Sequence, residues 1–214
     1  MQFNEPVVPR GRRRLPQPPP PSLDPESAQV LDAAVRLFWR HGYRQTTTRD
    51  IESLAGISLS RIYCLFGSKE RLLASALLRY AELLKRELLG PLEDSREGLE
   101  AICAFFDRLG HWVTHEGRPG CMLINMMAEP GSPATCIGHH AGSMNQRLTA
   151  AFESALQRAD AQGEVSAGDP SVRAQVLSTS VLGVNLAARG GAMDNELARM
   201  VSAIKSQVES WRAQ

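Results

Sequence analysis

Apolar residues recur along most of this chain at the period of an α-helix. From about residue 30 to 212 they return at intervals of three or four, as on one face of an amphipathic helix. The most regular series closes the chain and contains Leu197, Met200, Val201, Ile204, Val208 and Trp211. No segment combines the apolar–polar alternation of a strand with hairpin turn residues. The pattern therefore predicts an all-α fold.

Capping and breaking residues divide this pattern into about nine helices. Asp24 before Pro25 is a typical helix start, and Gly42 is a typical stop. Gly90-Pro91 is expected to stop the long fourth helix, because proline cannot continue the hydrogen-bond ladder. The expected helices run over about 24–42, 47–55, 58–66, 68–90, 96–116, 120–129, 132–162, 169–189 and 194–212.

Residues 47 to 69 carry a helix-turn-helix pattern. Thr47 and Asp50 resemble a capping box, and Gly56 can adopt the left-handed conformation that ends a helix. Ser58 can cap the next helix. The inward stripes are expected to contain Ile51, Leu54, Ala55, Leu59, Ile62 and Phe66. The second helix of such a unit fits the major groove, so the pattern predicts DNA binding.

Polar residues on the outward side of this unit are candidate DNA contacts. Arg61 could bond a guanine edge, Arg49 could reach a base, and Tyr63 could meet a phosphate. The full candidate set is Thr47, Thr48, Arg49, Ser58, Ser60, Arg61, Tyr63 and Lys69. Each residue alone could be an ordinary exposed side chain. Because the motif holds all of them in one register, the group as a whole favours the interpretation as a DNA-contacting surface. Cys64 is expected to pack against the first helix rather than to touch a base.

The same residues resemble a known family. Ala55-Gly-Ile-Ser58, Tyr63-x-x-Phe66 and Ser68-Lys-Glu-x-Leu-Leu73 are similar to the recognition-helix signature of the TetR/AcrR family of bacterial transcriptional repressors. Gly42-Tyr43-x-x-Thr-Thr-x-x-Asp-Ile51 resembles the lead-in of that family. Residues 120–129 resemble the start of the sixth helix in one of its branches. Cys64 and Leu65 depart from the usual pattern, which puts individual base and phosphate contacts in question.

The resemblance implies an organisation and a mechanism. Residues 24–70 would form a three-helix DNA-binding domain, and residues 71–214 a helical ligand-binding and dimerisation domain. Two copies would pair through about 170–189 and 194–212, where small residues such as Ser178 and Gly183 would permit close approach. The expected partners are a double-stranded DNA operator and an unknown small-molecule effector that releases the protein. Tyr63 and Lys69 would contact the DNA backbone.

The resemblance also implies an effector pocket between helices of the larger domain. Methionine-rich walls can adapt to varied ligands, although plain core packing is the alternative for each residue. The pocket candidates are Phe105, Trp112, Met122, Asn125, Met126, Glu129 and Met144.

Charge is distributed unevenly, although the net charge is only +1. Residues 1–72 contain 11 Lys+Arg and 7 Asp+Glu, whereas the remainder contains 13 and 16. A basic end on an acidic body is expected where one end meets phosphate. Residues 1–23, with Arg10-Gly-Arg-Arg-Arg14 and a proline run, are expected to form a disordered tail. We favour a solvated leader over an arm that enters the minor groove.

Several classes of protein lack support in the sequence. There is neither an apolar run of about 18 residues nor a secretory h-region, so we expect a cytoplasmic protein with no membrane contact and with reduced thiols. Gly-rich phosphate loops, nucleophile elbows and His-Glu-x-x-His pairs are absent, so we expect no enzyme.

The cysteines and histidines leave one alternative open. Cys136, His139 and His140 could surround a metal with Cys121 or His111, but no second pair has ligand spacing. We therefore expect no metal and no cofactor. The preferred function is a ligand-responsive transcriptional regulator. The alternatives are a constitutive dimeric DNA-binding protein without a pocket, and a thiol- or metal-responsive repressor.

Overall fold

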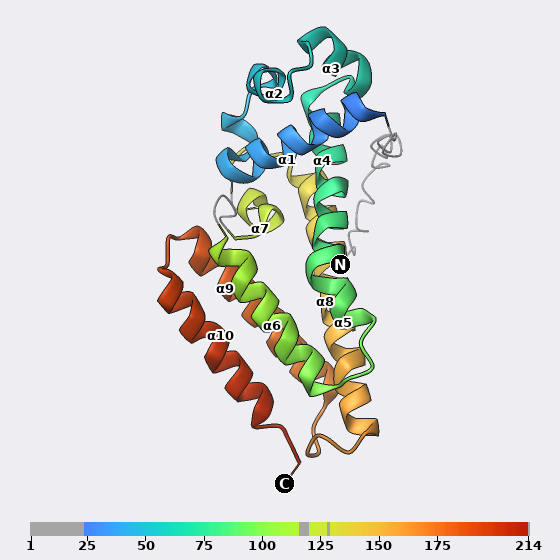
Figure 1. Cartoon of the computed structure of the whole chain (residues 1–214), viewed down its shortest axis with the longest axis vertical. Coiled ribbons are helices and arrows are strands. Elements are labelled where there is room, and N and C mark those ends of the chain that lie inside the picture. Colours follow the sequence, from blue (N-terminus) through green and yellow to red (C-terminus); the bar gives the residue numbers. More distant parts are fainter. Residues whose placement is uncertain (1–23, 116–119, 128, 214) are drawn as a thin grey trace, which may run out of the picture.

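The computed structural model describes residues 24–115, 120–127 and 129–213; the predicted tail over 1–23 lies outside them. Within the described residues there is no strand, and the one isolated β-bridge joins Val165 to Arg212. The described helices number nine when α4, η1 and α5 are counted as one continuous helix. The all-α prediction is confirmed (Figure 1).

A three-helix unit lies at one end of the molecule and consists of α1 (Pro25–Gln45), α2 (Thr48–Ala55) and α3 (Leu59–Phe66) (Figure 1). The predicted caps are present. The hydroxyl of Thr47 accepts the amide of Asp50, whose carboxylate accepts the amide of Thr47. Ser58 caps α3, and Gly56 ends α2 at φ 68°. The local sequence therefore determines where these short helices begin and end.

Two inward predictions for this unit are wrong. Leu54 is 49% exposed, and Cys64 is also exposed. Helices α2 and α3 have eight residues each, and their fully buried side chains are only Ile51, Ile62 and Phe66. Because so short a helix covers little of its neighbours, the other apolar positions are at most half-buried, as Ala55 and Leu65 are.

Helix α1 is interrupted at Gly42, where the sequence predicts a stop. Gly42 has φ 81° and ψ 174°, and a further helical turn carries α1 on to Gln45. The hydroxyl of Thr46 donates to the carbonyl oxygens of Leu37 and Gly42, at 3.1 and 2.7 Å. The two contacts hold the chain as it turns towards α2.

Helix α4 (Lys69–Leu84) runs from beside α1 into the larger part of the molecule (Figure 1). It does not stop at Gly90-Pro91 as predicted, but continues through the π turn η1 (Lys85–Leu89) into α5 (Gly90–Glu93). The amide of Gly90 donates to the carbonyl of Lys85, five residues earlier. A Cβ on Gly90 would lie 2.9 Å from that oxygen, so glycine permits the turn.

The larger part contains α6 (Leu99–Thr114), α7 (Met122–Met127), α8 (Ala134–Ala161), α9 (Pro170–Arg189) and α10 (Asp194–Glu209). Helix α8 packs along α9, and α6 packs along α10. The short helix α7 lies next to α1 (Figure 1). The rings of Phe105, Phe106 and Phe152 form part of the core between α6 and α8. None of the described helices is long and apolar enough to cross a membrane.

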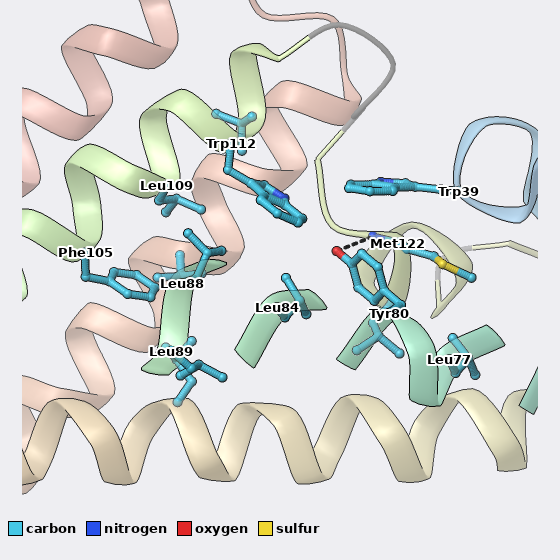
Figure 2. Close-up of a cluster of buried hydrophobic side chains, with 14 of the residues drawn as sticks. Trp39, Leu77, Tyr80, Leu84, Leu88, Leu89, Phe105, Leu109, Trp112 and Met122 are labelled. Carbon is cyan, nitrogen blue, oxygen red and sulfur yellow. Dashed lines mark hydrogen bonds between the residues drawn. The ribbon is translucent and has the colours of Figure 1, made fainter. Parts of the chain in front are cut away.

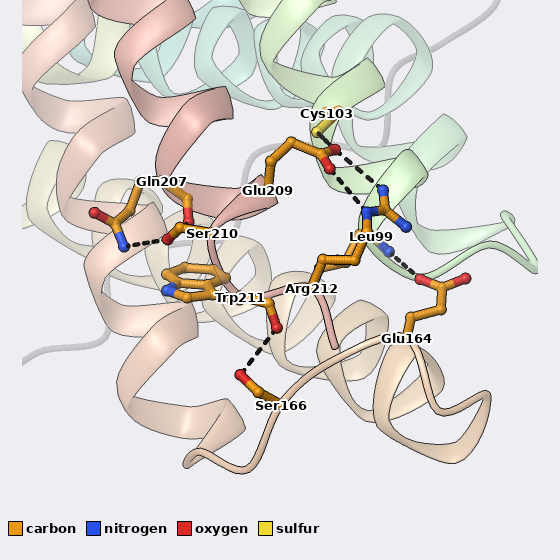
Figure 3. A network of polar contacts seen from close by, with 9 residues as sticks. All are labelled: Leu99, Cys103, Glu164, Ser166, Gln207, Glu209, Ser210, Trp211 and Arg212. Atoms are coloured by element: carbon orange, nitrogen blue, oxygen red, sulfur yellow. Dashed lines mark hydrogen bonds and ion pairs between the residues drawn. The ribbon is translucent and has the colours of Figure 1, made fainter. Parts of the chain in front are cut away.

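Polar contacts hold the C-terminal end against α6 (Figure 3). Glu164 accepts the amide of Leu99 at 3.0 Å, and Glu209 accepts the thiol of Cys103 at 3.7 Å. Burial, together with the nearby carboxylate of Glu209, raises the pKa of Cys103 to about 11. The amide and hydroxyl of Ser166 donate to the carbonyl of Trp211. Helices α6 and α10 are therefore fixed relative to each other.

Candidate functional site

The predicted DNA-contacting residues lie on α2 and α3, at the N-caps of these two helices and at the start of α4. Lys69 and Thr48 are half-buried, and the other six are exposed. The hydroxyls of Thr48 and Tyr63 lie 3.3 Å apart and join α2 to α3. Those of Ser58 and Ser60 are equally close. The outward polar surface that the sequence predicts is therefore present in the fold.

Two of these residues also have a structural role. The hydroxyl of Thr47 donates to the carboxylate of Asp50 at 2.8 Å while it accepts the amide of Asp50 at 3.1 Å. Hydrogen bonds from the backbone and side chain of Thr47 lower the pKa of Asp50. Ser58 accepts the amide of Arg61. Thr47 must give up its bond to Asp50 before its hydroxyl can donate to a phosphate.

Arg61 is held at the surface by an ion pair with α1. Its Nε donates to Glu26 at 2.7 Å, and both side chains are 45% exposed. The hydrogen bond and charge of Glu26 raise the pKa of Arg61. Exposed ion pairs contribute little to stability and exchange readily with other partners. Arg61 can therefore leave Glu26 for a base or phosphate at small cost.

Lys69 stands at the start of α4, beside a tyrosine that was not among the predicted site residues. Its Nζ lies 4.2 Å from the ring centroid of Tyr43. The hydroxyl of Tyr43 donates to Glu70 at 2.8 Å. Burial lowers the pKa of Lys69, whereas the charges of Glu70, Glu129 and Asp50 act in the opposite direction. Tyr43 thus positions the ammonium of Lys69 at the N-terminus of α4. The charge of the ammonium and the dipole of the helix both favour an anion at this place.

A cavity of about 320 Å³ lies within the larger part of the molecule. Its walls come from α4 with η1, and from α6, α7, α8 and α9. Three of the pocket candidates line it: Phe105, Trp112 and Met144. Figure 2 shows Phe105, Trp112 and Leu109 on α6 facing Leu88 across the same space.

Four other pocket candidates do not line the cavity: Met122, Asn125, Met126 and Glu129. Cys121, Leu123, Ile124 and Met127 line it instead. Met122 and Met126 are buried on another side of α7. Because apolar residues occupy nearly all of this six-residue helix, its sequence shows no polar face that would define its rotation.

The cavity is almost entirely apolar. None of the described residues that line it is charged, and its only side-chain amides belong to Asn145 and Asn185. Asn185 is 3% exposed, and its Nδ2 donates to the carbonyl of Val181 at 2.8 Å. Its Oδ1 is buried and has no hydrogen-bond partner in the described part of the chain.

Glu129 joins the larger part to the three-helix unit. Its carboxylate accepts the amides of Tyr43 and Arg44, both at 2.8 Å, directly after the break in α1. The indole of Trp39 donates to the carbonyl of Gly120 at 3.1 Å, just before α7. The segment around α7 therefore contacts α1, while α7 itself forms one wall of the cavity.

Helix α4 is also bonded to the segment that lines the cavity. The hydroxyl of Tyr80 accepts the amide of Met122 at 3.2 Å (Figure 2) and donates to the thiol of Cys121 at 3.4 Å. Because α4 begins at Lys69, one continuous helix connects this contact to the three-helix unit.

The thiol- or metal-responsive alternative depends on the cysteines and histidines. Burial raises the pKa of Cys121, which disfavours the reactive thiolate. The rings of His139 and His140 lie 5.7 Å apart, and burial lowers the pKa of His140. The side chain of Cys136 lies outside the described residues. In the described part of the chain, no three His, Cys, Asp or Glu residues are placed to hold a metal ion.

Helix α9 has apolar residues on two faces. Its buried face includes Leu177, Val184 and Ser178, whose hydroxyl lies 2.8 Å from that of Thr149. Ser178 is thus not available for close approach of a second copy, whereas Gly183 is exposed. The large apolar residues exposed on α9 and just after it are Val172, Val176, Leu182, Leu186 and Met193.

Comparison with known proteins agrees with this architecture. Residues 30–76 match the tetR family of bacterial regulatory proteins, and residues 98–204 match the tetracyclin repressor-like C-terminal domain. The HTH-type transcriptional repressor ComR of Escherichia coli (strain K12) is 26% identical over 166 residues, covering 76% of this chain and 79% of ComR.

Solved structures share the fold. A TetR transcriptional regulator from Chloroflexus aurantiacus J-10-FL superposes with a TM-score of 0.77 at 21% identity, covering 86% of this chain and 94% of that one. A cysteine mutant of the TetR family regulator CifR, complexed with 26-bp double-strand operator DNA, gives 0.74 at 19% identity, covering 86% and 95%. The three-helix unit, the helical body and both family matches lead to one conclusion: the chain belongs to the tetR family of bacterial regulatory proteins, which are DNA-binding transcriptional regulators.

Proposed function

We propose that this protein is a homodimeric repressor that leaves its operator when a small molecule enters the cavity. The observation that carries this proposal is the position of α7. Residues of α7 line the cavity, and Glu129, two residues after its end, holds the backbone of Tyr43 and Arg44 in α1. A molecule that displaces α7 thus acts directly on α1, which packs against the two helices that carry the candidate DNA contacts.

The DNA-binding part of the proposal draws on the outward surface of α2 and α3. Arg61, Ser60 and Tyr63 would enter the major groove with α3, and Lys69 would meet a phosphate at the start of α4. Thr47, Thr48, Arg49 and Ser58 would complete the contacts. The CifR complex shows that a protein of this fold can bind operator DNA.

The dimer part draws on the outer face of α9. Val172, Val176 and Leu186 expose apolar surface that a second copy would cover, together with α10. In a two-fold dimer the two α3 helices would enter successive major grooves about 34 Å apart, which matches a palindromic operator. The ligand would favour a conformer in which the two α3 helices have a different spacing. Binding of the ligand in the cavity would therefore weaken binding to the operator.

The test uses the full chain and genomic DNA. Fragments captured by the purified protein define the operator, and small molecules extracted from the host cells are then assayed for release of that duplex. A variant that fills the cavity, Ala141→Phe, should still bind the operator but resist release. Ala150→Phe adds the same ring to an exposed position of α8 outside the cavity and serves as the matched control.

Three results would count against the proposal. Equal affinity for operator and scrambled duplex would reject sequence-specific DNA binding. Release of Ala141→Phe at the same ligand concentration as the control would place the ligand elsewhere. If no extract releases the wild-type protein, the constitutive dimeric DNA-binding protein becomes the better account.

A further inference from the structure

We propose that the cavity takes an uncharged, largely apolar molecule that donates one hydrogen bond to Oδ1 of Asn185. This inference rests on the proposed function, because it specifies the chemistry of the effector. Two independent features of the cavity wall lead to it: the absence of charge among the described lining residues, and one buried acceptor whose hydrogen-bonding capacity is unused.

The wall excludes a charged ligand. The described lining residues offer neither an ammonium or guanidinium for an anion nor a carboxylate for a cation. A charge that leaves water without a partner loses far more solvation than an apolar wall returns. Leu88, Phe105 and Trp112 instead offer dispersion contact and a hydrophobic surface, which favour an apolar body.

The amide of Asn185 specifies one polar contact. Its nitrogen faces the carbonyl of Val181 at 2.8 Å, which fixes the orientation of the amide and makes the remaining atom an acceptor. This Oδ1 is buried without a partner in the described part of the chain, in a side chain only 3% exposed. A hydroxyl or N–H group on the ligand would satisfy it, whereas an ether or a methyl group would not.

The entrance to the cavity follows from the exposure of its lining. Met127 on α7 is 60% exposed and Leu182 on α9 is 42% exposed, although both line the cavity. Asn185 lies on α9 one turn beyond Leu182. A ligand that enters between α7 and α9 therefore passes Asn185 on its way to the aromatic wall of α6.

The experiment compares 1-naphthol with 1-methylnaphthalene, which have nearly the same shape and differ in one donor. Calorimetry on the full chain gives the affinity ratio of the two probes for the wild-type protein and for Asn185→Leu. The ratio should fall by about tenfold in the variant, because only the wild-type amide distinguishes a hydroxyl from a methyl group. Asn145→Leu changes the other amide of the cavity and should leave the ratio unchanged.

Each outcome decides one point. If Asn185→Leu binds 1-methylnaphthalene with unchanged affinity, the variant has kept its cavity. If Asn185→Leu does not fold, the same comparison is made with Asn185→Ala. An unchanged ratio with both probes bound overturns the role of Asn185 but leaves the proposed function intact. Binding of 1-naphthoate as tightly as 1-naphthol to the wild-type protein overturns the exclusion of charge. If neither neutral probe binds, the inference about the chemistry of the ligand is overturned, whereas the proposed function is decided separately by release of the operator from the wild-type protein and from Ala141→Phe.

Discussion

Arg61 meets Glu26 through its Nε in the free protein, so a contact with DNA that uses this nitrogen must replace an existing partner. The guanidinium of Arg61 can bond two atoms of a guanine edge, which a small apolar residue cannot imitate. The ion pair with Glu26 at 2.7 Å competes with that contact. The role of Arg61 can therefore be tested with two substitutions, one that removes the arginine and one that removes the charge of Glu26.

For Arg61→Ala we expect about a tenfold or greater loss of affinity for the operator and a much smaller loss for random DNA. Glu26→Gln should change operator affinity in the opposite direction, because it frees the guanidinium. Lys69→Ala, which removes the candidate phosphate contact, should weaken both duplexes alike. Fluorescence anisotropy with the two duplexes measures all three. Equal losses on both duplexes for Arg61→Ala would make it a phosphate contact rather than a reader of sequence.

Tyr43 connects the candidate phosphate contact to the fold. Tyr43→Phe removes the hydrogen bond to Glu70 and should lower the free energy of unfolding at pH 7 by about 1 kcal/mol, a modest value for a bond to a charge because Glu70 is exposed. Denaturant unfolding of both proteins measures the difference. Tyr63→Phe, at an exposed tyrosine 3.3 Å from Thr48, is the control and should have less effect.

The loss of stability in Tyr43→Phe should depend on pH, and the pKa of Glu70 gives the sign of this dependence. The hydrogen bond from Tyr43 lowers the pKa of Glu70 below its ordinary value of 4.5 in the folded protein. Its stabilising effect is therefore fully present above pH 4.5 and is lost as the pH falls through the lower folded pKa. The stability difference between wild type and Tyr43→Phe should shrink below pH 4.5. A constant difference down to pH 3 would contradict this account.

At the level of elements, local chemistry identifies helix ends better than helix rotation. Thr47, Ser58 and Gly56 act as the sequence predicts, because caps depend on residues three or four positions apart. The rotation of α7 depends on contacts with α1 and on the cavity, which lie far away in sequence. The continuation of α4 past Gly90 depends on a π turn, for which the pattern holds no signal. The position of Glu129 was likewise missed, because its partners lie 85 and 86 residues away.

Gly42 offers a test of the contact between Glu129 and α1. A Cβ at Gly42 would lie 2.6 Å from Oε2 of Glu129, at a backbone conformation that almost only glycine adopts. Gly42→Ala should lower the free energy of unfolding by about 3 kcal/mol, from backbone strain and the displaced carboxylate together. Gly56 also has a positive φ, but a Cβ there would meet open space. Gly56→Ala should therefore lower the free energy of unfolding by only about 1 kcal/mol.

A double variant separates the two causes. In Glu129→Ala the carboxylate is gone, so Gly42→Ala should cost less there than in the wild-type background. Thermal unfolding of the four proteins closes the cycle. Equal costs in both backgrounds would mean that the carboxylate moves aside freely and does not hold α1.

At the level of the whole molecule, the outer face of α9 carries apolar side chains that stay exposed in a single chain and add nothing to its stability. Val176→Glu, at a residue 47% exposed, should dissociate the proposed dimer and reduce operator affinity, because a charge in the interface would be buried without a partner. Leu54→Glu adds the same charge to an equally exposed leucine on α2 and should leave the dimer intact. Sedimentation velocity distinguishes the two. A monomeric wild type, or a dimer unaffected by Val176→Glu, would remove α9 from the interface.

The central claim is that the surface of α2, α3 and the start of α4 binds a specific DNA duplex. The most direct measurement is the affinity of the full chain for its captured operator and for a scrambled duplex of the same length, over a range of salt concentrations. We expect the operator to bind much more tightly, with an affinity that falls steeply with salt because several phosphate contacts release counterions. Equal affinity for the two duplexes, or an affinity independent of salt, would contradict the account.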